Sequence, residues 1–127
     1  MKRLVRVARY LKGQQSLVVW FALDKKQHGS LLVTLLLWSD ASWAAPDSQR
    51  KSVSCGVIEA SGCVMHSHSR RQSVISLSSA ESEFYALSAV ALEGRLFARI
   101  LEFFGFIVKS YALTDSSAAK GIAQREG

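Results

Sequence analysis

The chain has 127 residues, 49% of them hydrophobic, and its 16 lysines and arginines outnumber its 10 aspartates and glutamates to give a net charge of +6. A chain of this length forms one domain or part of one, and its hydrophobic content excludes an intrinsically disordered protein. The positive charge favours a polyanionic partner such as nucleic acid, although charge alone is a weak indication.

The N-terminal third predicts a helix and two strands. Apolar residues recur every three or four positions in residues 1–12, with lysines and arginines between them, and Gly13 is a natural helix end. The basic face of this helix is either solvated or contacts phosphates. Residues 16–23 predict a strand, and 24–30 a polar turn. The continuous apolar run 31–38 predicts a strand that is covered on both faces.

The middle of the chain predicts a hairpin. The only proline lies in the segment 45–48, which predicts a loop. Residues 52–59 and 63–69 predict two strands, and the short Ala-Ser-Gly segment between them is typical of a hairpin turn. A short strand at 74–77 is expected either to follow this unit or to extend it.

The last third predicts a long helix, a strand and a short helix. Ser78 and Glu81 match a capping box, and the apolar face that follows continues for about six turns, up to Gly105. Residues 107–113 predict a strand, and a serine cap precedes a helix from Ala118 onward. The order of elements predicts an α/β domain.

Cysteine content and the N-terminal pattern bear on the compartment. Cys55 and Cys63 are too few for a disulfide framework, and we expect both as small buried residues in strands, which indicates a reducing compartment. The first thirteen residues lack a signal-peptide pattern, and the run 31–38 is too short to cross a bilayer. We therefore expect an intracellular protein, cytoplasmic or nuclear, without a membrane partner.

Acidic residues stand where predicted elements begin or end. Asp40 and Asp115 each follow an apolar run, and each is either a turn residue or a metal ligand. Glu81 and Glu83 lie at the start of the long helix. Carboxylates from separate elements can converge on divalent metal, and two metals about 3.5–4 Å apart drive phosphodiester hydrolysis. Residues two apart on a helix point roughly 200° apart. Only one glutamate can therefore face the metal, and we favour Glu83, because Glu81 is the capping residue.

Basic and histidine side chains cluster around the predicted hairpin. Arg50, Lys51, Arg70 and Arg71 flank it and either contact phosphates or are simply solvated. His66 and His68 alternate with Arg70 on a predicted strand, so the three side chains share a face. Two histidines can bind zinc, but no third ligand and no zinc-site spacing is evident in the sequence.

Five short motifs occur in the order found in one family. They are RYLKG at 9–13, WSDASWA at 38–44, RKSVS at 50–54, the segment from SRRQ to the tyrosine at 69–85, and TDSSAA at 114–119. Together they resemble the ribonuclease H domain at the end of the polyprotein of copia-type retrotransposons. The resemblance covers essentially the whole chain.

This resemblance implies a mixed sheet of five strands with flanking helices. It implies a metal-dependent endonuclease that hydrolyses the RNA strand of RNA–DNA hybrids with Mg²⁺, Mn²⁺ being an alternative. Asp40, Glu83 and Asp115 match the catalytic metal ligands of the family. The implied partners are an RNA–DNA hybrid and the reverse transcriptase domain of the same polyprotein, in a cytoplasmic retroelement particle or the nucleus.

The sequence departs from the family pattern at its end. No residue before Gly127 matches the fourth acidic ligand, and the last strand and helix are missing. The expected organisation is a basic lead-in helix at 1–13 and an RNase H-like domain at 14–127, truncated at its C-terminus. We expect weak or no cleavage by this chain. The alternative function is a catalytically inactive remnant that keeps nucleic-acid or partner binding.

Overall fold

A computed structural model describes residues 2–14, 16, 29, 31–44 and 49–125. None of the helices in these ranges is long and apolar enough to cross a membrane. The elements are α1 (Lys2–Gly13), β1 (Leu32–Ser42), β2 (Val53–Ala60), β3 (Cys63–Arg71), α2 (Ser79–Phe103), β4 (Ile107–Leu113) and α3 (Ser117–Ala123).

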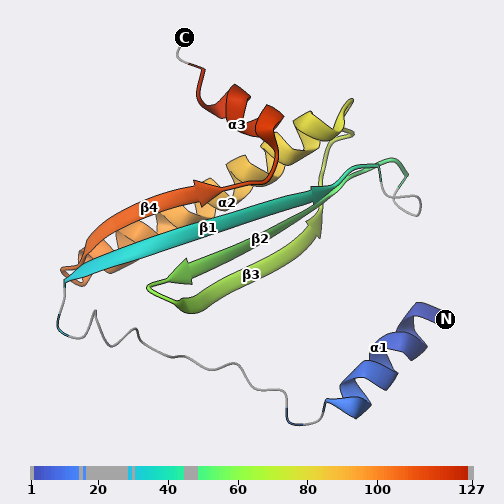
Figure 1. Ribbon diagram of the computed structural model, residues 1–127, viewed down its shortest axis with the longest axis horizontal. Helices are drawn as coiled ribbons and strands as arrows, with labels where there is room; N and C mark the ends of the chain where they lie inside the picture. The colour runs from blue at the N-terminus through green and yellow to red at the C-terminus, as the bar shows by residue number, and fades with distance from the viewer. Residues whose placement is uncertain (1, 15, 17–28, 30, 45–48, 126–127) are drawn as a thin grey trace.

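The strands form one mixed sheet in the order β3-β2-β1-β4. β1 pairs antiparallel with β2, which pairs antiparallel with β3, and β1 pairs parallel with β4. Parallel neighbours require a long crossover, and α2 supplies it, lying across one face of the sheet (Figure 1). The predicted α/β class with a hairpin and one parallel pair is confirmed. The described residues form four strands, whereas the family resemblance implied five with the last one missing from this chain.

The core lies between α2 and the sheet. Side chains alternate between the faces of a strand, so Leu35 and Leu37 point toward the helix, with Ile58 beside them on β2. Val90 packs on them from α2 and is fully buried. Gly94 allows a close approach, because a Cβ there would lie 2.4 Å from Cδ1 of Leu37. These contacts fix the position of α2, and with it every side chain on its sheet-facing side.

The predicted cap at the start of α2 is confirmed. Ser78 Oγ accepts a hydrogen bond from the Glu81 backbone at 3.1 Å. The Glu81 carboxylate accepts in return from the Leu77 backbone at 2.7 Å, one residue earlier than in the usual capping box. The helix stops just before Gly105, which adopts a φ of +87° that favours glycine.

The predicted strand at 74–77 is wrong. That segment is an irregular connection, and its three apolar side chains are exposed. Buried Gln72 holds it instead: the side-chain amide donates to Ser54 Oγ at 2.8 Å and to the Ser82 carbonyl at 2.9 Å, and accepts from Ser76 Oγ at 2.8 Å. A polar network between distant residues therefore replaces strand pairing.

Residues 17–23 of the predicted strand at 16–23 lie outside the described residues, and Ser16 lies in a turn. β1 runs to Ser42 rather than ending at residue 38, because β2 pairs with it over its whole second half. Asp40 therefore lies within a strand rather than after one.

Candidate metal centre

Asp40 and Asp115 are neighbours because of the parallel pairing of β1 and β4. The last pair in this ladder is Trp38 with Leu113. Each aspartate lies two residues beyond that pair, Asp40 within β1 and Asp115 just after the end of β4, and the two strands run in the same direction. The carboxyl ends of the two strands therefore bring both side chains to one edge of the sheet.

Glu83 joins them from the first turns of α2. Asp40, Glu83 and Asp115 each offer a carboxylate oxygen, and these three atoms lie within 4.8 Å of one another. Hard cations bind oxygen ligands at about 2.0–2.6 Å, so one ion can contact all three. The structure brings together the three acids expected from the sequence, while their role as metal ligands stays a prediction.

The electrostatics of this cluster favour a cation. Burial raises the pKa of Glu83, a hydrogen bond from the Ala41 backbone opposes this shift, and the negative charges of Asp40 and Asp115 raise it further. Glu83 Oε2 is buried and has no hydrogen-bond partner within the described part of the chain. A buried carboxylate oxygen without a partner is costly, and a bound cation would remove that cost.

Glu81 is engaged elsewhere. Besides capping the helix, it raises the pKa of Tyr85 by a hydrogen bond and by its charge. Glu81 is not among the converging carboxylates. The structure therefore separates the two glutamates as the helical geometry predicts.

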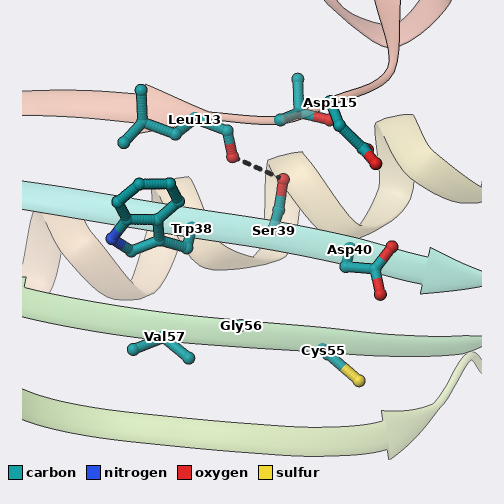
Figure 2. A pocket seen from close by; sticks show the side chains of 9 residues that line it. Trp38, Ser39, Asp40, Cys55, Gly56, Val57, Leu113 and Asp115 are labelled. Carbon is teal, nitrogen blue, oxygen red and sulfur yellow. Dashed lines mark hydrogen bonds between the residues drawn. The ribbon is translucent and has the colours of Figure 1, made fainter.

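A pocket of about 470 Å³ lies beside the carboxylates (Figure 2). Trp38, Val57 and Leu113 line it with apolar surface, and Asp40 and Asp115 lie at one end. Ser39 Oγ donates to the Leu113 carbonyl at 3.2 Å and ties β1 to the end of β4. By alternation along β1, this pocket opens on the sheet face opposite Leu37. It can therefore hold an apolar group next to a bound cation.

The four basic residues predicted to bind nucleic acid do not share one face. Arg50 and Lys51 precede β2, and Arg70 and Arg71 end β3, at the same end of the sheet as Asp40. Arg70 points to the helix-covered face, where its guanidinium contacts Glu93. Arg71 alternates to the other face. Their contact with nucleic acid stays a prediction.

Sequence reasoning missed Glu93. It lies three residues after Val90 and four before Phe97, in the row of α2 that faces the sheet. An acid in such an apolar row is unusual and would have indicated a buried partner. The structure places it beside His66 and His68.

No family model matches this chain, and no solved structure does. The chain is similar to secreted RxLR effector protein 161 of Plasmopara viticola, with 33% identity over 90 residues, which are 71% of this chain and 59% of the relative. The aligned region thus spans less than two thirds of that relative's length.

These findings correct four expectations from the sequence. The assignment to a copia-type ribonuclease H domain, the nuclease function in retrotransposon reverse transcription and the descriptions drawn from them are not supported, because the similar protein is named an effector and no family model matches. The expected intracellular location is likewise overturned, because that protein is named as secreted.

The physical reason for the error is that the motifs mark strand ends and a helix start. Such positions recur wherever a fold recurs, whereas function depends on the site that the fold carries. The expected location rested on Cys55 and Cys63 and on the lack of a signal-peptide pattern in the first thirteen residues. Both cysteines lie in strands, β2 and β3, as predicted, but only Cys63 is buried while Cys55 is half-buried. Cysteines without a disulfide fit more than one compartment.

Proposed function

We propose that this domain binds a divalent cation, Mg²⁺ or Mn²⁺, through Asp40, Glu83 and Asp115. The observation that carries the proposal is the convergence within 4.8 Å of three carboxylate oxygens, from β1, from α2 and from the connection after β4. An all-oxygen donor set suits Mg²⁺ and Mn²⁺ rather than metals that prefer sulfur or imidazole. The buried, unpartnered Oε2 of Glu83 supports the same conclusion.

The pocket beside the carboxylates suggests what else would bind. Three protein ligands leave coordination positions open on a cation that prefers six. A phosphorylated ligand fills such positions, and an aromatic or apolar part of it fits against Trp38, Val57 and Leu113.

The net charge of +6 favours a polyanion. We therefore propose a nucleic-acid duplex, an RNA–DNA hybrid among the candidates, as a binding partner. Contact with a reverse transcriptase domain stays an untested prediction.

We also propose that the architecture is RNase H-like. Its support is the strand order β3-β2-β1-β4 with a single parallel pair and the crossover through α2. This proposal concerns the fold alone and carries no activity with it.

A second candidate function comes from the similar protein. We propose that this chain belongs to a secreted effector-type protein, in which the cation site stabilises the domain or presents a ligand. Its support is the 33% identity over 90 residues. The test is to express the complete gene that encodes this chain in cells of the organism it comes from. Protein in the culture medium supports the proposal, and protein retained inside the cells contradicts it.

Calorimetric titration tests the cation site. Mg²⁺ is added to the metal-stripped 1–127 chain and to Asp40→Asn and Asp115→Asn variants, with Glu81→Gln as the matched acid-to-amide control. We expect saturable binding in the parent chain and in the control, and loss of at least tenfold in affinity in either aspartate variant. Equal affinity in all four proteins would contradict the proposal.

A further inference from the structure

A second group of donor atoms lies on the helix-covered face of the sheet. His66 and His68 alternate on β3, and Glu93 reaches them from α2. One nitrogen of each imidazole and one oxygen of Glu93 lie within 4.8 Å of one another. None of these residues belongs to the carboxylate cluster of Asp40, Glu83 and Asp115.

The spacing of these atoms matches a metal coordination shell. His68 Nδ1 lies 2.9 Å from Glu93 Oε2, and His66 Nε2 lies 3.6 Å from the same oxygen. Zinc binds nitrogen and oxygen at about 2.0–2.1 Å, so ligand atoms at tetrahedral corners stand about 3.3 Å apart. The observed distances lie on either side of that value.

His68 is buried in a way that requires a partner. Its side chain is only 8% exposed, and its ring lies over Gly56, where a Cβ would come within 2.5 Å of Cε1. Both ring nitrogens and Glu93 Oε2 are buried without a well-aligned hydrogen bond to any described residue. Glu93 Oε2 lies within ion-pairing distance of a protonated His68, but the two groups lack the alignment of a hydrogen bond, and a metal ion between them would coordinate both.

Neighbouring side chains orient the ligands. Phe97 stacks on His66 with ring centres 5.9 Å apart and planes at 30°. The Arg70 guanidinium contacts Glu93 Oε1 and leaves Oε2 directed at the imidazoles. Groups that hold a ligand in this way are a general feature of metal sites. The charge of Arg70 also weakens the attraction of Glu93 for a cation.

We propose that His66, His68 and Glu93 form a zinc site, with water completing the shell beside His66, whose side chain is 40% exposed. Two imidazoles and one carboxylate suit Zn²⁺, whereas the carboxylate cluster suits Mg²⁺ or Mn²⁺. The two sites therefore differ in metal as well as in place. This inference does not depend on the proposed function.

The test measures Zn²⁺ affinity by competition with a chromophoric chelator. The protein is the metal-stripped, tag-free 1–127 chain, and it carries Asp40→Asn and Asp115→Asn so that the carboxylate cluster binds no metal. We expect one zinc per chain, and at least a tenfold loss of affinity in His66→Ala and in Glu93→Gln. His28→Ala, the chain's remaining histidine, is the matched control and should bind as before. Co²⁺ in place of zinc should give the visible absorption of a tetrahedral site, and His66→Ala should abolish it.

His66→Ala and Glu93→Gln alter partly exposed side chains, so a folding defect in a His68 variant would not affect the test. Unchanged zinc affinity in both variants would overturn the proposal. Absence of bound zinc in the chain without these two substitutions would also overturn it, and the three residues would then be an ion-pair cluster around Glu93. Mg²⁺ binding by chains with intact aspartates should be unaffected by His66→Ala, so failure here is distinguishable from failure of the Mg²⁺ site.

Discussion

Glu83 stabilises the metal-free domain only when it is protonated. Burial and the charges of Asp40 and Asp115 hold its pKa above the ordinary value of 4.5. A carboxyl with a raised folded-state pKa contributes stability that is fully present below its unfolded pKa and is lost as the pH rises through the folded-state pKa. As the pH rises above its ordinary pKa, Glu83 therefore lowers the free energy of unfolding of the metal-free domain.

Replacing this residue should therefore have opposite effects with and without metal. In a chelator at pH 7, Glu83→Gln should raise the melting temperature by a few degrees, because the variant removes a buried charge. With excess Mg²⁺ the parent should be the more stable, because binding adds about 2.7 kcal/mol at a hundredfold excess over Kd. Differential scanning calorimetry at both conditions measures this. A variant less stable than the parent in chelator would refute the electrostatic argument.

The cap of α2 permits a separate test that leaves the metal site intact. Ser78→Ala removes the oxygen that accepts from the Glu81 backbone. Loss of an N-cap hydroxyl costs about 0.5–2 kcal/mol, and we expect that decrease in urea unfolding with unchanged Mg²⁺ affinity. Ser79→Ala, one residue inside the helix, is the control and should cost less. If both serines cost the same, the cap assignment is wrong.

The contact between α2 and β1 depends on Gly94. A methyl group there would meet the Leu37 side chain at 2.4 Å, so Gly94→Ala should destabilise the chain by about 1–3 kcal/mol, as overpacking does. Gly121→Ala in α3 is the matched change, because a Cβ there has no neighbour within 4 Å. It should be neutral or stabilise by up to about 1 kcal/mol. Thermal unfolding of the two variants distinguishes these effects, and equal losses would contradict the packing described.

Elements with local determinants were predictable from the sequence. The long helix was, because Ser78 and Glu81 mark its start and its apolar face repeats, and so was the hairpin around residues 60–62. The irregular path of residues 74–77 was not predictable. Gln72 fixes it through hydrogen bonds to Ser54 and Ser82, and no local sequence pattern encodes those contacts. The extent of β1 depended in the same way on its pairing with β2.

The candidate sites were predictable to different degrees. Asp40, Glu83 and Asp115 could be grouped because each stands at a recognisable position in its element. Glu93 could not be joined to His66, because their proximity depends on how α2 crosses β3. The family was inferred from short motifs, and the location from two cysteines and the lack of a signal-peptide pattern; the similarity to a secreted effector overturned both. The fold limits which residues meet, and it leaves function to the particular site.

A crystal of the 1–127 chain grown with Mn²⁺ gives the most direct test of the carboxylate site. An anomalous difference map collected near the manganese edge locates bound ions without reference to activity. We predict a peak with carboxylate oxygens of Asp40, Glu83 and Asp115 at about 2.0–2.6 Å, the range for hard cations and oxygen ligands. A crystal saturated with Mn²⁺ that shows no peak among these carboxylates, or one bound only by exposed acids elsewhere, would contradict the assignment.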